Sequence, residues 1–145
     1  MYGHILIPTD GSVLSEVAIR QGIALAKAVN ARVTGITVFP PFHTFATEPM
    51  MITDTPALYR KDCEALGAKY LAVIEDAATT SGVACDVVQA EDDQPYRAII
   101  DTASARGSDL IVMASHGRKG VTALVLGSET TKVLTHTKIS VLVCR

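Results

Sequence analysis

The feature that most constrains the fold is residues 109–128, where an apolar run leads into a glycine-rich loop. Residues 110–114 are wholly apolar, which is typical of a central parallel strand covered on both faces. The loop holds Gly117 and Gly120 with two cations between them, and Gly127–Ser128 then opens a predicted helix. Glycine lets the backbone approach a phosphate, and a helix N-terminus favours negative charge. The order therefore predicts a nucleotide or phosphate site at the end of a buried strand.

The rest of the chain alternates β-rich runs with stretches of helical periodicity. The predicted strands are residues 4–8, 32–39, 84–88, 110–114 and 140–144. The predicted helices begin near residues 14, 56, 95 and 128, and the first three end at Asn30, Gly82 and Gly107. Residues 40–55 show no clean period and predict a long loop. Five strands alternating with four helices predict an α/β fold, a parallel sheet with helices on both faces, in one domain over residues 1–145.

Two predicted helices carry an apolar stripe with spacings of three and four residues. The first stripe consists of Leu14, Ala18, Gly22, Leu25 and Val29, and the second of Tyr59, Cys63, Leu66, Tyr70, Val73 and Ala77. We expect these stripes to be the buried faces of the two helices.

Composition and charge restrict the class of protein. Of the 145 residues, 48% are hydrophobic and 19% are charged, which is typical of a globular domain. The net charge of −2 gives no strong field to recruit nucleic acid. The start of the chain shows no leader pattern and no window is apolar over the length of a bilayer, so we expect a cytoplasmic protein without a membrane partner.

The three cysteines are an odd number at wide spacing. Cys63, Cys85 and Cys144 form no C-x-x-C pair and have no neighbouring histidine pattern for zinc. We expect reduced, mostly buried thiols and no metal site. The acidic run Glu91–Asp93 precedes a predicted helix, where carboxylates ordinarily complement the helix dipole.

The glycine-rich stretch resembles the nucleotide motif of the universal stress protein family. That motif is a glycine, two residues, a glycine, nine residues and then Gly-Ser or Gly-Thr. Here Gly117 is followed by nine residues and Gly127–Ser128, whereas the first glycine is replaced by Ala114. The resemblance runs from Ile5–Gly11 near the start to the last strand, so it covers essentially the whole chain.

The resemblance implies a doubly wound, Rossmann-like fold of the adenine nucleotide alpha hydrolase type, with strand order 3-2-1-4-5. The reversal between strands one and four makes a crevice at their carboxyl ends. The cofactor implied there is ATP, with or without Mg²⁺, or none if Ala114 blocks the site. The implied cofactor-binding residues are Pro8, Thr9, Asp10, Val38, Met113, Ala114, His116, Gly117, Arg118, Gly127, Ser128 and Glu129.

Several of these residues have a structural alternative. In relatives the carboxylate at Asp10 accepts hydrogen bonds from adenine or ribose, whereas alone it also suits an Asx turn or a helix cap. Gly117 and Gly127–Ser128 suit phosphate and ribose, or else two turn glycines and a capping serine. Val38 matches a backbone contact to adenine, or is a plain strand residue. Arg118 suits phosphate screening, or is a solvated loop cation.

Chemistry beyond binding has little support in the sequence. No P-loop, no G-x-S-x-G elbow and no early G-x-G-x-x-G is present. No motif places a carboxylate or a hydroxyl nucleophile beside His116. We therefore expect no catalytic residues and at most a slow ATPase. The favoured function is a nucleotide-dependent sensor or regulator in stress response, and the alternative is a stress protein that binds no ATP and acts through protein partners.

The last strand predicts an assembly. Residues 140–144 are apolar at the centre and lie at the sheet edge in the implied strand order, without lysine, proline or a bulge signal inside the run. We expect a homodimer in which this strand pairs with its own copy, as in many universal stress proteins.

Overall fold

The computed structural model describes residues 1–43, 55–117 and 125–145. Its elements are β1 His4–Pro8, α1 Val13–Val29, β2 Arg32–Phe39, α2 Pro56–Ser81, β3 Cys85–Glu91, α3 Pro95–Arg106, β4 Leu110–Ala114, α4 Ser128–His136 and β5 Ser140–Cys144. Most of the predicted loop over residues 40–55 lies outside the described ranges. No helix in the described ranges combines the length and the apolar character needed to cross a membrane.

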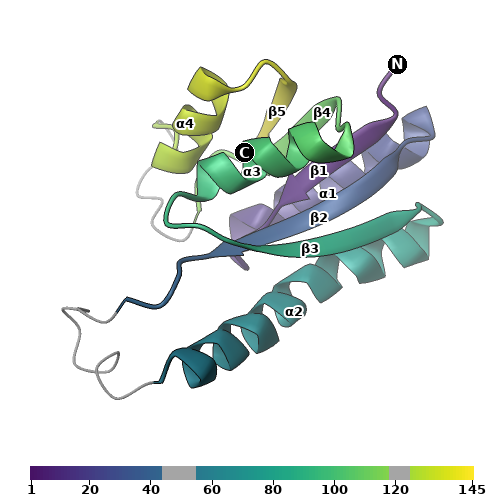
Figure 1. The fold of residues 1–145 in the computed structure, drawn as a ribbon. Coiled ribbons are helices and arrows are strands. Elements are labelled where there is room, and N and C mark those ends of the chain that lie inside the picture. The colour runs from purple at the N-terminus through teal and green to yellow at the C-terminus, as the bar shows by residue number, and fades with distance from the viewer. Residues whose placement is uncertain (44–54, 118–124) are drawn as a thin grey trace.

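The five strands form one parallel sheet in the order β3-β2-β1-β4-β5, which confirms the predicted topology (Figure 1). Strand β1 lies at its centre, where Ile5 is paired with Val33 of β2 and with Leu110 of β4. The chain moves outward from β1 to β3 and then returns to β4 on the other side. This reversal leaves the carboxyl ends of β1 and β4 side by side without a connecting helix above them.

Two cores cover the two faces of the sheet. On one face, Ile5, Ile7, Leu110 and Val112 pack with residues of α1 and α2. On the other, Leu6, Ile36, Ile111 and Met113 pack with α3 and α4. Alternate residues of β1 and β4 therefore enter opposite cores, which explains why both strands are apolar throughout.

The predicted buried stripe of α2 is wrong by one residue position. The buried residues of α2 are Gly67, Leu71, Ile74 and Ala78, whereas Leu66 and Val73 are 48% and 40% exposed. Small residues explain the difference. A β-carbon on Gly67 would overlap the side chain of Gln89, and a β-carbon on Gly35 of β2 would overlap Ile74. The helix therefore approaches the sheet closely on its Gly67 face.

In α1 the buried face is also shifted from the prediction. Ala18 and Gly22 are buried as expected, but Leu14, Leu25 and Val29 only pack at the margin of the core. The centre of the contact is made by Ser15, Ile19, Ile23 and Ala26 together with the two predicted residues. A β-carbon on Gly22 would overlap Ile7 of β1, so this helix too sits close to the sheet.

Two smaller expectations are corrected. Strand β3 continues to Glu91, three residues beyond the predicted end, because β2 offers pairing partners as far as Phe39. Of the three free cysteines only Cys144 is buried, and Cys63 and Cys85 are half-buried. Cys63 lies on α2 and Cys85 opens β3, the edge strand that α2 covers.

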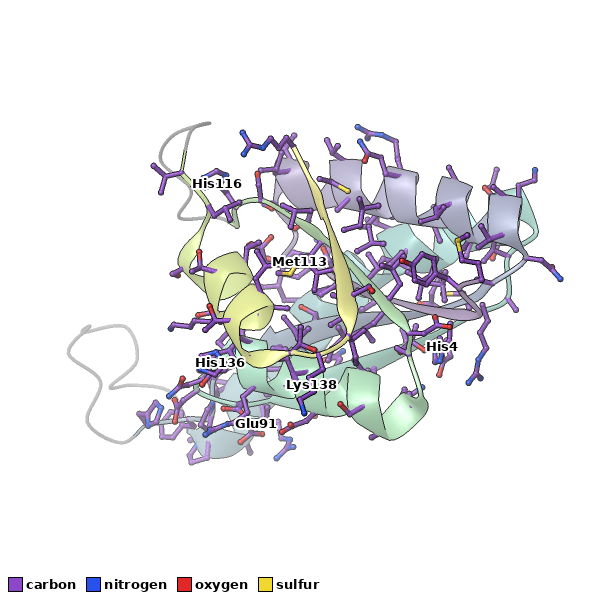
Figure 2. The ribbon with its side chains drawn as sticks, turned by 90° about the horizontal axis from the view of Figure 1, so that it is seen from above. His4, Glu91, Met113, His116, His136 and Lys138 are labelled. Atoms are coloured by element: carbon purple, nitrogen blue, oxygen red, sulfur yellow. The ribbon has the colours of Figure 1, made fainter. Side chains whose placement is uncertain are left out.

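A polar network joins the amino ends of the central strands. His4 Nε2 lies 2.7 Å from Thr34 Oγ1, whose hydroxyl donates to Asp86 Oδ1 at 2.6 Å. Arg106 completes it with an ion pair to Asp86, while its carbonyl oxygen lies 3.1 Å from His4 Nδ1. Burial and the charge of Arg32 lower the pKa of His4. His4 and His116 lie at opposite ends of the sheet (Figure 2).

Candidate functional site: a cavity between the ends of β1 and β4

A cavity of about 470 Å³ opens where the carboxyl ends of β1, β2 and β4 meet. Its lining residues are Pro8, Thr9, Asp10, Ser15, Ile36, Val38, Pro40, Asp92, Asp93, Pro95, Ile99, Met113, Ala114, His116, Gly117, Gly127, Ser128, Glu129 and Thr130. Each predicted site residue within the described ranges is among them. Arg118 lies outside the described residues. The volume is within the range of pockets that bury small ligands.

The end of β1 presents the Asp10 carboxylate to the cavity in one fixed orientation. Asp10 Oδ1 accepts a hydrogen bond from the Ser15 hydroxyl at 2.7 Å and one from the Ser12 backbone N–H at 3.0 Å. The turn beyond it is held by Gly11, which has φ +79° and donates its N–H to Thr9 Oγ1 at 3.2 Å. Asp10 thus makes the predicted Asx-type turn and also lines the cavity.

The end of β4 approaches Asp10 through Gly117. A β-carbon on Gly117 would overlap Asp10 Oδ2, so any other residue here would displace the carboxylate from its present position. The φ angle of Gly117 is not positive. Glycine is therefore favoured here by the limited space and not by the backbone conformation. Residues more than a hundred positions apart in the chain meet here.

Ala114 stands where the family motif has glycine, and it is the last residue of β4. Its φ is not positive, since Asn30 is the only non-glycine residue of the described ranges with a positive φ. Ala114 is buried and packs in the core formed with α1, next to Val112 and Cys144. The methyl group therefore replaces a hydrogen without backbone strain.

The first turn of α4 forms another wall of the cavity. Gly127 is its N-cap and contributes no side-chain hydrogen bond to the exposed N–H groups, whereas Ser12 caps α1 in the usual way. Gly127 N–H donates to the Ser115 carbonyl at 2.7 Å, and Thr130 Oγ1 donates to the Ala114 carbonyl at 2.8 Å. These two bonds dock α4 on the end of β4, with Ser128 and Glu129 facing the cavity.

The rest of the lining comes from residues that sequence reasoning missed. It includes Ile36, Pro40, Pro95 and Ile99, with Asp92 and Asp93 at the β3–α3 junction. These residues could have been predicted from the sequence. All strands of a parallel sheet end at the same edge, so the residues that follow β2 and β3 lie at the same edge as those that follow β1 and β4. Ser15 had no such signal, because only the turn geometry brings it back toward Asp10.

The carboxylates around the cavity are mostly paired. Asp92 binds Arg97 at 2.8 Å, and this hydrogen bond together with one from the Gln94 N–H keeps the pKa of Asp92 below its usual value. Asp93 contacts His43 Nε2 at 2.6 Å, and Glu129 contacts Lys132 Nζ at 3.5 Å. Across residues 1–43, 55–117 and 125–145 no three histidine, cysteine or acidic side chains come together as a metal site.

His116 follows β4 directly, beyond Met113 in Figure 2. Its Nδ1 lies 3.0 Å from Ser115 Oγ, and its Nε2 is buried with no hydrogen-bond partner. No described carboxylate orients the ring, which is what a general base paired with a nucleophile requires. The cavity therefore offers binding groups, and its arrangement matches no hydrolytic triad.

A doubly wound parallel sheet with a cavity at its switch point defines an α/β domain of the kind that binds small ligands at the strand ends. The model of the universal stress protein family matches residues 1–145. The chain belongs to the universal stress protein family. It is 31% identical to a universal stress protein of Methanocaldococcus jannaschii, over 100% of this chain and 83% of that one.

Solved structures agree with this assignment. Universal stress protein UspA from Lactobacillus plantarum is 28% identical, with a TM-score of 0.78 over 99% of this chain and 98% of that one. Two more distant structures share the fold and hold nucleotides. A universal stress protein in complex with cAMP is 21% identical, with a TM-score of 0.70 over 99% of this chain and 97% of that one. One from Archaeoglobus fulgidus in complex with dAMP is 18% identical, with a TM-score of 0.69 over 99% and 98%.

Proposed function

We propose that this protein binds an adenine nucleotide, ATP or a close relative, in the cavity between β1 and β4. In this proposal it acts in the cytoplasm as a nucleotide-dependent sensor or regulator of the stress response. The observation that carries the proposal is the meeting of Asp10, Gly117 and the first turn of α4 in one cavity. The nucleotide complexes of the two structural relatives support it.

The groups that line the cavity suit the parts of a nucleotide. Val38, Met113 and Ile36 provide apolar surface for a base, and Asp10 provides an acceptor for an amino group or a ribose hydroxyl. Gly127 and Ser128 present the N-terminus of α4, whose N–H groups suit phosphate oxygens. An adenine nucleotide combines an apolar base, donors on its base and ribose, and negative phosphates, so each of its parts has a matching group in this lining.

We propose that any Mg²⁺ in the site is bound by the triphosphate of ATP and not by carboxylates of the protein. The cavity carboxylates Asp92, Asp93 and Glu129 already contact Arg97, His43 and Lys132. Binding a cation through them would first require breaking these contacts. Hydrolysis by a dedicated base is not part of the proposal, so the protein is proposed to report nucleotide level by binding.

The alternative function, a stress protein that acts without ATP, rested on Ala114. Ala114 has an ordinary strand backbone and its methyl group packs in the core. The departure from the glycine motif therefore adds no backbone strain, and although Ala114 lines the cavity we favour the nucleotide-binding function. We also propose that partner proteins respond to whether this protein has a nucleotide bound.

We further propose that the protein acts as a homodimer joined through β5. This strand pairs with β4 on one side and with no other described strand. Leu142 at its centre is 40% exposed. Pairing of β5 with its own copy would satisfy the free N–H and C=O groups of both strands and cover this side chain.

The test of the proposed site is an NMR titration of ¹⁵N-labelled protein with ATP. We expect the largest amide shifts at Asp10, Gly117 and Ser128, with His4 and its network at the far end of the sheet unchanged. The Gly82 amide, which lies in an open turn far from the cavity, serves as an internal control. Shifts spread evenly over the surface, or no shifts at millimolar ATP, would refute the proposal.

A further inference from the structure

Ser15 is a buried polar residue in the wall of the cavity and belongs to no recognised motif of this sequence. It lies in the first turn of α1 and is 4% exposed. Its hydroxyl is 2.7 Å from Asp10 Oδ1 and 2.9 Å from Ser12 Oγ, while the Asp10 backbone N–H approaches it at 3.5 Å. One hydroxyl therefore touches both the backbone and the carboxylate of Asp10.

The directions of these hydrogen bonds follow from the donors available. Asp10 Oδ1 accepts, so the Ser15 hydroxyl proton points at the carboxylate. Ser15 Oγ then accepts from the Ser12 hydroxyl, and Ser12 Oγ accepts in turn from the Ser15 N–H at 3.2 Å. This series of hydrogen bonds ends at the charged Asp10 carboxylate, so the bond from the Ser15 hydroxyl to Asp10 Oδ1 is the strongest of them. The Asp10 rotamer is thereby fixed before any ligand arrives.

Fixing this rotamer has a consequence for ligand binding. Two donors, the Ser15 hydroxyl and the Ser12 N–H, converge on Oδ1, while Oδ2 lies on the Gly117 side. A ligand that uses this carboxylate as an acceptor meets it already oriented, and pays no entropy to order it.

We propose that Ser15 is a positioning residue for the nucleotide site, which acts by orienting Asp10 toward a ligand that donates a hydrogen bond. The inference rests on the proposed function. It assigns to a serine in the first turn of α1 a second role, in affinity and in the selection of a ligand with a donor at that point. A purely structural role in the first turn of α1 would affect stability alone.

The test is a double-mutant cycle of Ser15→Ala and Asp10→Ala, with ATP affinity measured by calorimetry. We expect Ser15→Ala to weaken binding roughly tenfold in the parent background, the scale of one hydrogen bond to a charged group. In the Asp10→Ala background the same change should leave affinity unaltered, because Ser15 then has no carboxylate to orient. Ser15→Thr keeps the hydroxyl and should restore most of the affinity.

Two further variants separate positioning from stability. Thr55→Ala removes the N-cap of α2, outside the residues that line the cavity, and should lower the unfolding midpoint without changing affinity. Ser15→Cys keeps nearly the same volume with a weaker donor and should fall between the parent and Ser15→Ala, even where the alanine variant folds poorly.

The outcomes distinguish the two proposals. If the parent binds ATP and Ser15→Ala binds it equally well, or loses affinity by the same factor with and without Asp10, the positioning role is overturned and the nucleotide site stands. If the parent binds no adenine nucleotide at all, the proposed function falls, and the role of Ser15 falls with it.

Discussion

The Asp10 carboxylate lies against Gly117 so closely that a β-carbon on Gly117 would overlap Asp10 Oδ2. This contact joins the turn after β1 to the loop after β4 at the switch point of the sheet. The φ angle of Gly117 is not positive, so its backbone conformation does not call for glycine. The close approach of Asp10 gives the steric reason for a glycine at this position. The same two residues line the cavity where we place the ligand.

Gly11, in the turn after β1, is expected to tolerate no side chain. It has φ +79°, and a β-carbon would overlap the ring of Tyr70 from α2. Gly82 offers a matched control, with φ +71° and no atom within 4 Å of the added carbon. We expect Gly82→Ala to cost about 1 kcal/mol of unfolding free energy, and Gly11→Ala to cost about 1–3 kcal/mol more.

Urea unfolding of the two glycine variants measures this difference. If Gly11→Ala and Gly82→Ala lose the same free energy, then the Tyr70 ring moves aside at no cost and does not hold the turn.

The dimer proposal makes a prediction about the β5 edge. Leu142→Lys places a charge on the exposed side of this edge strand and should shift the protein toward monomer, because charged side chains on an edge strand oppose edge-to-edge pairing. Leu134→Lys is the control, since Leu134 is exposed to a similar extent, 41% against 40%, but lies on α4. Light scattering at micromolar concentration measures the mass. A monomeric parent, or a dimer that Leu142→Lys leaves intact, would exclude this interface.

The free energy of unfolding is predicted to decrease as the pH falls, because the pKa of His4 is lower in the folded protein than in the unfolded chain. Burial and the charge of Arg32 lower the pKa of His4 from 6.5, against the opposing effects of Asp86 and Asp109. The unfolded chain therefore takes up this proton at a higher pH than the folded protein. The folded state loses stability as the pH falls from about 6.5 through the lowered pKa, below which the loss is complete.

The measurement for His4 is the unfolding free energy at several pH values from 7.5 to 5.5, in the parent and in His4→Gln. Asp86 does not contribute in this range, because Thr34 and Arg106 outweigh its burial and hold its pKa below 3.8. We expect a shallower slope in His4→Gln. An identical slope in both proteins would assign the pH dependence to other groups.

Turnover of ATP is expected to be slow. The His116 ring hydrogen-bonds to the Ser115 hydroxyl, but no described carboxylate orients the ring as the base of a hydrolytic triad requires. The rate should remain far below the median of about 10 s⁻¹ for ordinary enzymes. A phosphate-release assay checks this. A rate near that median which disappears in Asp10→Asn would make the protein an enzyme, contrary to our account.

The sequence was sufficient for the topology because its strongest signals are local. Apolar strands such as Leu110–Ala114 and the glycine stops at Gly82 and Gly107 define the elements, and the family resemblance supplies their order. The buried face of α2 was not predictable in the same way. Leu66 and Val73 are apolar, yet Gly67 and Ile74 face the sheet because Gln89 and Gly35 of the partner strands fit them. Such complementarity is visible only once both surfaces are in place.

In the site, too, some residues could be predicted from the sequence and others could not. Motif spacing identified Gly117 and Gly127–Ser128, and the family resemblance implied Asp10 and Val38, all of which line the cavity. Ser15 escaped detection because its role depends on a turn that folds back on Asp10. The effect of Ala114 depended on a backbone angle, which no sequence pattern reports.

The central claim is that the contact between Asp10 and Gly117 belongs to an adenine nucleotide site. Calorimetric titration of ATP into the parent and into Gly117→Val tests it most directly, with circular dichroism to confirm that the exposed Gly117 position leaves the fold intact. We predict measurable ATP affinity in the parent and its loss in Gly117→Val at unchanged helix and strand content. Equal affinity in both proteins, or no binding to the parent, would contradict the account.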